Sequence, residues 1–256
     1  MADRPRKGPG WYVISLRPRG EHGGLRQAAA RAGAGLIALS PWRLQLRRGA
    51  ATQRALAAAL AAPAVVFTSP AAVRAAVKLR ALPVGPGRQW CAVGAGTAAA
   101  LRRAGVREVQ VPQRMDSEGV LALPVLQALD GVEVGLVTAP GGRDLLAPAL
   151  EARGARLRRA DVYARLPVAP APTAVAMLCR VDAPLALALS SGDALQLALR
   201  ALPDSAADRL RSAQVLAAST RLAALASELG FGDITVAAGP RPGQLVAAAR
   251  LPVAAG

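Results

Sequence analysis

Pairs of hydroxyl residues stand directly after two apolar runs of the chain. Thr68-Ser69 follows AVVF and precedes a proline, and Ser190-Ser191 follows LALAL and precedes a glycine. This order is typical of helix N-caps, and capping alone explains both pairs. Where such caps face a cleft, their hydroxyls and the unpaired N–H groups behind them can also bind a ligand carboxylate.

Groups suited to acid-base or metal chemistry are few. His22 is the only histidine, so no catalytic triad or Cys-His pair can be built around another imidazole, and we interpret it as a polar loop residue. Cys91 and Cys179 lie far apart without a Cys-x-x-Cys spacing, and we expect two buried, reduced thiols. Asp116-Ser117 before VLALPVLQAL predicts the capped start of an apolar helix. The sequence thus predicts no metal site.

A glycine-rich turn, GAGTAA at residues 94–99, follows the run WCAV and matches the form G-x-G-x-x-A of a dinucleotide-binding turn. The run EVQV should then end in an acidic residue that binds the ribose. Pro112 stands there instead, and Asp116 comes later. A nucleotide-dependent oxidoreductase is therefore disfavoured.

The chain carries 32 basic and 16 acidic residues among 256, a net charge of +16. Such a field attracts anions, although a compositional bias toward arginine on solvated faces explains the count as well. Seven aromatic residues leave little for stacking on single-stranded nucleic acid. The apolar run from Trp11 to Leu16 is too short for a secretory signal. The uncharged stretch 55–73 contains two prolines, so we expect no membrane span and a cytoplasmic chain.

Short apolar runs alternate with stretches of helical period, which favours an α/β fold with parallel sheets. The expected strands are WYVISL, GLIAL, AVVFT, WCAV, EVQV, VEVGLV, ARLRRADVY, LALAL, AQVLAA and DITVAA. The two halves also run in step at an offset of about 120 residues. The matched features are Gly33 with Gly154, Trp42 with Tyr163, Thr68-Ser69 with Ser190-Ser191, and 94–105 with 219–230. We therefore predict two similar α/β modules with a cleft between them, and ligand groups at the carboxyl ends of the strands.

The order of these motifs resembles the uroporphyrinogen-III synthase family over nearly the whole chain. The places that carry the resemblance are LRP at 16–18, FTSPAAV at 67–73, VGAGTAAALRRAG at 93–105, SEG at 117–119, GGRDLLAPALEARGA at 141–155, VY at 162–163, LSSGDAL at 189–195 and SELGF at 227–231. The resemblance implies a first domain of residues 1–39 and 168–256, a second of 47–162, and a two-stranded connection of 40–46 and 163–167.

The resemblance also implies the reaction. Linear hydroxymethylbilane loses its hydroxyl as water and closes to uroporphyrinogen III with the last pyrrole ring inverted, as a step of heme biosynthesis. It implies no cofactor, no metal, no nucleic acid and no membrane partner. We expect a monomer that contacts the preceding pathway enzyme at most transiently. Because the substrate carries eight carboxylates, an arginine-rich protein suits it.

Tyr163 is our candidate proton donor to the departing hydroxyl, since its phenol can donate and it lies where the domains join. The alternative is that Tyr163 is only a half-buried aromatic residue of the linker, without a role in catalysis. Arg17 and Arg143 each follow the first strand of their repeat and are expected to attract the substrate anion. The expected substrate-binding residues are Arg17, Thr68, Ser69, Gly94, Thr97, Arg143, Ser190, Ser191 and Ser219.

Three positions depart from the family pattern. Leu16 stands where a Thr usually precedes the Arg, Ala71 stands where Asn is usual, and residues 219–221 replace a glycine turn. Polar contacts at these points are therefore in doubt. The alternative from another class is a two-lobed, non-catalytic binding protein for an acidic ligand or nucleic acid.

Overall fold

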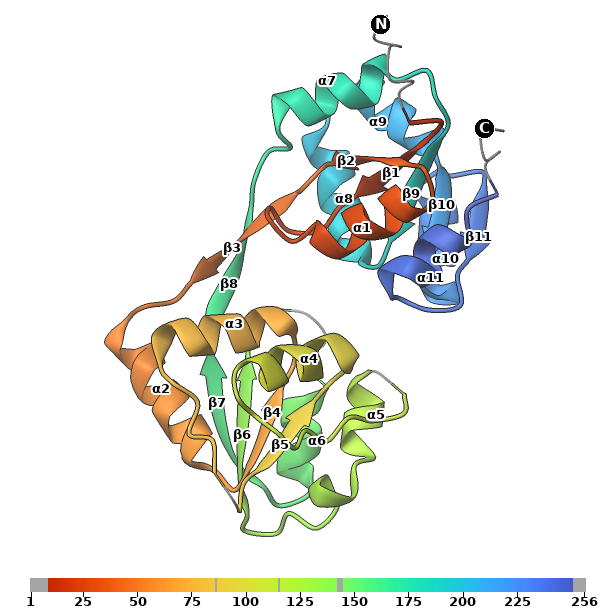
Figure 1. Cartoon of the computed structure of the whole chain (residues 1–256). Helices are drawn as coiled ribbons and strands as arrows, with labels where there is room; N and C mark the ends of the chain where they lie inside the picture. The colour runs from red at the N-terminus through yellow and green to blue at the C-terminus, as the bar shows by residue number, and fades with distance from the viewer. Residues whose placement is uncertain (1–8, 86, 115, 142–144, 251–256) are drawn as a thin grey trace, which may run out of the picture. The chain divides into compact units, whose positions relative to one another are not determined.

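A computed structural model describes residues 9–85, 87–114, 116–141 and 145–250. The chain divides into two compact units (Figure 1). Unit 1 comprises Met1–Arg43 and Leu166–Gly256, and unit 2 comprises Leu44–Arg165. Each unit is built around its own parallel sheet, so the predicted α/β class is confirmed.

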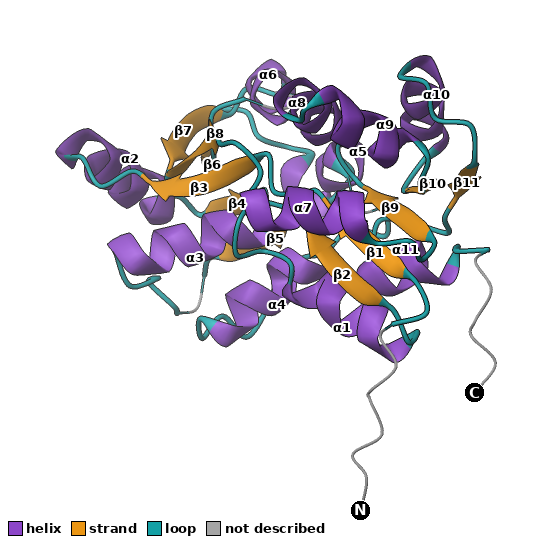
Figure 2. Ribbon diagram, turned by 90° about the horizontal axis from the view of Figure 1, so that it is seen from above, coloured by secondary structure: helices purple, strands orange, loops and turns teal. Residues whose placement is uncertain are grey.

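The sheet of unit 1 has five parallel strands, visible side by side in Figure 2. Their order is β11 (Ile234–Val236), β10 (Gln214–Ala217), β9 (Leu185–Leu189), β1 (Tyr12–Ser15) and β2 (Gly35–Ala38). Helices α1 (Gly23–Arg31) and α11 (Pro242–Ala247) pack on one face. Helices α7 (Pro172–Arg180), α8 (Gly192–Ala201), α9 (Asp204–Arg211) and α10 (Thr220–Glu228) pack on the other. Strand β9 is buried along its whole length, which is why LALAL reads as an unbroken apolar run.

The sheet of unit 2 has four parallel strands in the order β5 (Gln89–Ala92), β4 (Ala64–Phe67), β6 (Glu133–Thr138) and β7 (Arg156–Asp161). Helices α2 (Ala50–Ala61), α3 (Pro70–Leu79) and α4 (Ala95–Arg103) cover one face. Helices α5 (Ser117–Leu121) and α6 (Leu146–Ala152), with the 3-10 turn η1 (Pro124–Leu126), cover the other. Helix α2 lies so close to β6 that a Cβ on Gly135 would fall 2.0 Å from the carbonyl oxygen of Ala59. Only glycine fits there.

The chain passes between the units in two strands, β3 (Trp42–Leu46) and β8 (Tyr163–Pro167), which pair with each other. The pairing is flanked by the hydrogen bond from the N–H of Arg47 to the carbonyl of Val162 and by that from the N–H of Val168 to the carbonyl of Pro41. This is the two-stranded connection that the sequence predicts.

The two sheets share one strand order, which supports the internal repeat. The order β10-β9-β1-β2 in unit 1 corresponds to β5-β4-β6-β7 in unit 2. The glycines that the repeat pairs also share a conformation. Gly33, Gly154, Gly105 and Gly230 follow α1, α6, α4 and α10 in turn and all have φ between 67° and 94°, a backbone shape that favours glycine.

Three expectations about local structure are wrong. The run EVQV makes only an isolated bridge, Gln110 to Cys91, because Pro112 has no N–H with which to extend the pairing. The run VLALPVLQAL is not one helix, since Pro124 cannot continue α5 and starts η1 instead. Cys179 is exposed on α7, whereas Cys91 is buried, and this burial raises the pKa of its thiol to about 12.

Candidate functional site

Those residues singled out by the sequence that the structure describes lie at the carboxyl edges of the two sheets. In unit 1, Arg17 follows β1, Ser190-Ser191 follows β9 and Ser219 follows β10. In a parallel sheet this edge also holds the N-termini of the following helices, so it offers unpaired N–H groups to an anion.

A small cavity of about 140 Å³ opens at this edge of unit 1. It brings together Arg17, Ser190 and Ser191, which the sequence predicts, and adds Trp42, the first residue of β3. Its remaining lining residues are Leu16, Pro18, Ala188, Leu189 and Ala194. Ser219 is not among the lining residues; its hydroxyl caps α10 by accepting a hydrogen bond from the N–H of Leu222 at 3.4 Å.

The Arg17 guanidinium has one buried N–H donor for which the described residues provide no acceptor. Its Nε is buried and has no hydrogen-bond partner among the described residues. Burial lowers the pKa of Arg17 from its ordinary value, and the nearby Glu21 carboxylate acts in the opposite direction. Arginine nevertheless stays protonated in proteins. Because Arg17 lines the cavity, an anion there would meet a charged donor, which makes the strongest kind of hydrogen bond.

The hydroxyls of Ser190 and Ser191 differ in their surroundings. Ser191 is the N-cap of α8 and accepts a hydrogen bond from the N–H of Ala194 at 3.3 Å, as the cap motif predicts. Ser190 is exposed at the mouth of the same turn. One serine therefore fixes the helix N-terminus while the other is accessible to a ligand.

His22 ends the loop between β1 and α1, as the sequence suggested, but its side chain is buried. It is only 8% exposed and occupies the N-cap position of α1. Its Nδ1 lies 2.8 Å from the hydroxyl of Ser15, and its Nε2 lies 2.8 Å from the hydroxyl of Ser40. The ring is buried because these two serines satisfy both of its nitrogens.

The carboxyl edge of unit 2 is closed by hydrogen bonds between its own side chains. Thr68 donates from its hydroxyl to that of Thr138 at 2.9 Å, which joins the ends of β4 and β6. Ser69 caps α3 by accepting from the N–H of Ala72 at 3.1 Å. Its hydroxyl also lies 3.1 Å from the phenol oxygen of Tyr163.

Tyr163 is 4% exposed and packs in the core of unit 2. Because Ser69 already accepts from Ala72, it can accept from the phenol through its other lone pair and keep its own hydrogen free to donate. Ser69 is the less buried of the two. A proton leaving Tyr163 therefore has a hydroxyl next to it through which it can pass.

The other predicted residues of unit 2 have different settings. Gly94 is the N-cap of α4, and its carbonyl accepts from the N–H of Thr97 at 3.0 Å. Thr97 is 4% exposed, so its side chain lies inside the fold while its backbone belongs to the helix start. Arg143 lies outside the described residues.

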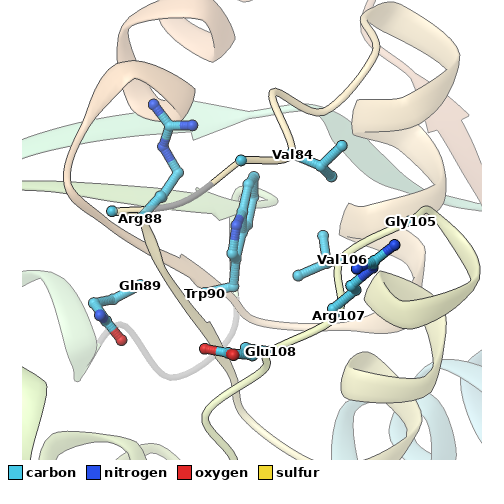
Figure 3. A pocket seen from close by; sticks show the side chains of 10 residues that line it. Val84, Arg88, Gln89, Trp90, Gly105, Val106, Arg107 and Glu108 are labelled. Atoms are coloured by element: carbon cyan, nitrogen blue, oxygen red, sulfur yellow. The ribbon is translucent and has the colours of Figure 1, made fainter.

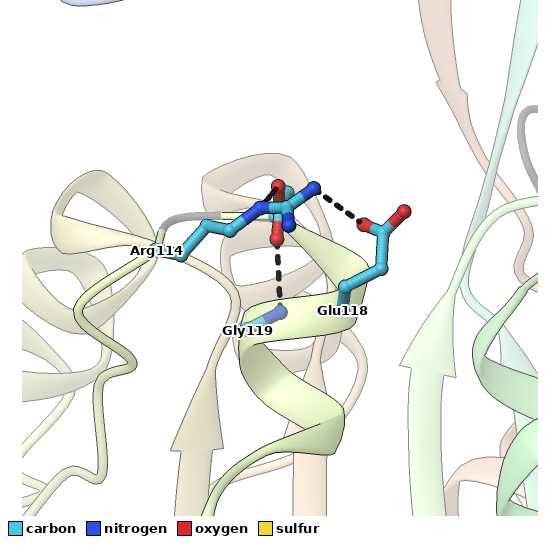
Figure 4. A network of polar contacts seen from close by, with 4 residues as sticks. Arg114, Glu118 and Gly119 are labelled. Atoms are coloured by element: carbon cyan, nitrogen blue, oxygen red, sulfur yellow. Dashed lines mark hydrogen bonds and ion pairs between the residues drawn. The ribbon is translucent and has the colours of Figure 1, made fainter.

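The acidic turn before α5 is a helix cap, as the sequence predicts. The Asp116 carboxylate accepts from the N–H of Gly119 at 2.8 Å, and Arg114 bonds to Asp116 and lies 3.7 Å from Glu118 (Figure 4). A Cβ at Gly119 would fall 1.8 Å from the carbonyl oxygen of Arg114. The glycine is thus needed for the tight approach of the chain, and the turn has a structural role.

A larger cavity, about 570 Å³, lies at the amino end of β5 in unit 2 (Figure 3). Thr68 and Ser69 follow the carboxyl end of β4, at the opposite edge of this parallel sheet. Its Arg88 donates to the carbonyls of Ala62 and Pro83 and lies 5.8 Å from the ring centroid of Trp90. These contacts use the guanidinium to hold the loop before β5. The cavity lies away from the predicted residues.

Within the described residues, no group of three or more His, Cys, Asp and Glu side chains is placed to hold a metal ion. No helix in the described part of the chain has the length and apolar character that crossing a membrane requires.

Sequence reasoning missed three groups at these edges: Trp42, Thr138 and His22. Trp42, which lines the cavity, could have been found from the sequence, because the repeat pairs it with the candidate Tyr163. Thr138 ends β6 and its role depends on the neighbouring Thr68, which only the sheet order reveals. His22 gave no signal, since Ser15 and Ser40 are distant in the sequence.

Comparison with known proteins assigns the family. The family profile described as uroporphyrinogen-III synthase HemD matches residues 24–247, which is most of the chain. The chain belongs to the uroporphyrinogen-III synthase family. The uroporphyrinogen-III synthase of Escherichia coli (strain K12) is 33% identical over 150 residues, covering 58% of this chain and 61% of that protein. The protein of the same name from Salmonella typhimurium is 34% identical over 157 residues, covering 60% and 63%. The matched region thus spans less than two thirds of either relative.

Solved structures of the family share the fold. A crystal structure of a mutant uroporphyrinogen III synthase from Thermus thermophilus aligns with a TM-score of 0.56 at 20% identity, covering 92% of this chain and 96% of that one. The uroporphyrinogen-III synthetase of Helicobacter pylori aligns with a TM-score of 0.55 at 14% identity, covering 90% and 92%. At these identities the likeness concerns the fold.

Proposed function

We propose that this member of the uroporphyrinogen-III synthase family is a hydro-lyase that converts hydroxymethylbilane to uroporphyrinogen III. The observation that carries the proposal is the family match over residues 24–247. The two sheet edges carry groups that suit this substrate, namely a half-buried arginine and hydroxyl-capped helix N-termini for its carboxylates, and a phenol for its leaving hydroxyl.

Arg17 is the proposed contact for a substrate carboxylate in unit 1. A carboxylate that enters the cavity would meet the Arg17 guanidinium and the accessible hydroxyl of Ser190. The N-termini of α8 and α10 in unit 1, and of α3 and α4 in unit 2, add positive dipole ends at the edges where Ser191, Ser219, Ser69 and Gly94 stand. Positioning of this kind is what the reaction needs most, because spontaneous closure gives the uninverted isomer.

Tyr163 is the proposed proton source. When the carbon–oxygen bond of the hydroxymethyl group breaks, the departing oxygen takes a proton and leaves as water. The phenol supplies that proton, directly or through the hydroxyl of Ser69, which lies 3.1 Å away. Inversion then changes three carbon–carbon bonds. The last ring attacks the methylene carbon through its substituted α-carbon, the bond from that α-carbon to the adjacent bridge breaks, and the ring's free α-carbon bonds to that bridge carbon. The proton released from this free α-carbon restores the phenol.

One assay tests the proposal. Hydroxymethylbilane is generated in situ, the protein is added, and the oxidised porphyrin products are separated by chromatography. Isomer III in excess over the protein-free reaction is the expected result. Isomer I alone, at the uncatalysed rate, would contradict the proposal and favour a non-catalytic binding protein for an acidic ligand.

A further inference from the structure

His22 connects two separate segments of unit 1 that meet at the cavity. Ser15, at the end of β1, bonds to Nδ1, and Ser40, after β2, bonds to Nε2, both at 2.8 Å. Each serine lies two residues before a side chain of the cavity wall, Ser15 before Arg17 and Ser40 before Trp42. One imidazole therefore holds both of the chain segments that lead to the cavity, the one before Arg17 and the one before Trp42.

The bond between His22 and Ser15 also closes the loop that carries Arg17. This loop runs from the end of β1 to the start of α1, and it turns at Gly20 with φ 85°. Ser15 and His22 stand at its two ends. Closing a loop at its ends reduces the conformations available to the residues inside it.

The two serines allow a neutral ring to donate from one nitrogen and accept at the other, because each hydroxyl can do either. The Ser15 oxygen also accepts a long hydrogen bond from the N–H of Arg17 at 3.5 Å, so we expect Ser15 to donate to Nδ1 and Nε2–H to donate to Ser40. The ring then links the backbone of Arg17 to Ser40 through hydrogen bonds.

We propose that His22 is a positioning residue, which holds Arg17 and Trp42 at the cavity so that the Arg17 guanidinium meets a substrate carboxylate. The proposal rests on the proposed function for its substrate. Its geometric part concerns only the described residues of unit 1.

The kinetic test uses His22→Gln, whose amide is polar but cannot bridge two serines in the same geometry. We expect KM for hydroxymethylbilane to rise about fivefold, which is the change in binding that loss of one ordinary hydrogen bond produces. The value of kcat should change little. In the background of Arg17→Gln the same substitution should raise KM no further, because His22 acts through Arg17. An unchanged KM, or equal and additive effects in both backgrounds, would overturn the proposal.

Gln214→Ala is the matched control for lost stability. Gln214 is also buried in unit 1, and its side chain accepts from the N–H of Arg250 at 2.9 Å. It begins β10, at the amino edge of the sheet, away from the cavity. Both variants should lower the melting temperature, but only His22→Gln should raise KM. A rise of KM in both variants would mean that loosening unit 1 suffices, and the proposal would be wrong.

An NMR measurement separates this proposal from the proposed function. Since His22 is the only histidine, its ring nitrogens can be observed without ambiguity, and we expect the Nε2–H form. The buried Nε–H of Arg17, assigned by its loss in Arg17→Gln, should exchange slowly with water and faster in His22→Gln. Unchanged exchange would overturn the positioning role even if the wild type makes isomer III. If the wild type makes isomer I alone while exchange accelerates, only the proposed function fails.

Discussion

The carboxyl edges of the two units use equivalent positions for different contacts. The repeat matches Thr68-Ser69 with Ser190-Ser191, and strand pairing extends this match to the neighbouring strands of each sheet. The result is four equivalent pairs, with unit 1 first: Arg17 and Thr138, Ser190 and Thr68, Ser191 and Ser69, Trp42 and Tyr163. Both cap serines begin equivalent helices, α8 and α3.

In unit 2 the four side chains satisfy one another, with Thr68 bonded to Thr138 and Ser69 to Tyr163. In unit 1 an arginine replaces the threonine and a tryptophan replaces the tyrosine. The result is a cavity of about 140 Å³ and a buried Nε–H without a partner. If the proposed function holds, we expect the two units to have different roles, with unit 1 binding a substrate carboxylate and unit 2 holding the proton donor.

The largest effect is expected in unit 2, from Tyr163→Phe. The variant keeps the buried ring and removes the phenol that bonds to Ser69, so kcat should fall roughly ten- to a hundredfold, the lower end of general-acid effects. The product should still be isomer III, because geometry rather than the proton sets the isomer. Trp42→Phe at the equivalent position is the matched control and should change KM more than kcat. An unchanged kcat in Tyr163→Phe would remove the proton-donor role.

The next effect is expected in unit 1, from Arg17→Gln. Loss of the charged donor should raise KM roughly tenfold and flatten its dependence on salt, since a hydrogen bond to a charged group is worth about 1.5–3 kcal/mol. Arg200→Gln makes the same change of charge on an exposed residue at the far end of α8 and should leave KM within about twofold. Equal effects of the two variants would mean that net charge alone attracts the substrate.

The fold class and several of the compared residues could be predicted from the sequence, whereas features that depend on tertiary contacts could not. The repeat, the α/β class and the caps Ser69 and Ser191 follow from local patterns of apolar and hydroxyl residues. The run EVQV looked like a strand from its apolar residues, although the Pro112 that ends its pairing stands beside it in the sequence. The burial of His22 could not be predicted, because it depends on two serines that come near only after folding.

A smaller effect is expected from removing hydroxyls at equivalent positions. Thr68→Ala breaks the bond to Thr138 and should cost on the order of 1 kcal/mol of stability, whereas exposed Ser190→Ala should cost almost nothing. Ser69→Ala and Ser191→Ala each lose a cap worth about 1 kcal/mol. Ser69→Ala should cost more, since it also removes the partner of Tyr163. Urea unfolding measures these differences, and equal losses at Thr68 and Ser190 would break the comparison.

The smallest effect comes from the titration of His22, because it vanishes at neutral pH. Burial lowers the pKa of this imidazole below its ordinary value of 6.5, with further lowering by Arg26 and Arg17 and an opposing effect of Glu21. The unfolded chain therefore binds a proton at a pH where the folded chain does not. The free energy of unfolding should then fall as pH drops below about 6.5, and it should be unaffected above that value.

His22→Gln provides the reference for this last prediction, because it removes the titrating ring and leaves the carboxylates in place. Both proteins lose stability near pH 4 as carboxyl groups protonate, so the comparison uses the window from about pH 7.5 to pH 5. As the pH falls through this window, the free energy of unfolding of the wild type should decrease relative to that of His22→Gln. In unit 2 the equivalent edge is held by hydrogen bonds among the hydroxyl groups of Thr68, Thr138, Ser69 and Tyr163. Parallel curves of unfolding free energy against pH would show that His22 has the same pKa in the folded and unfolded protein. The predicted pH dependence of the unit 1 edge would then be wrong.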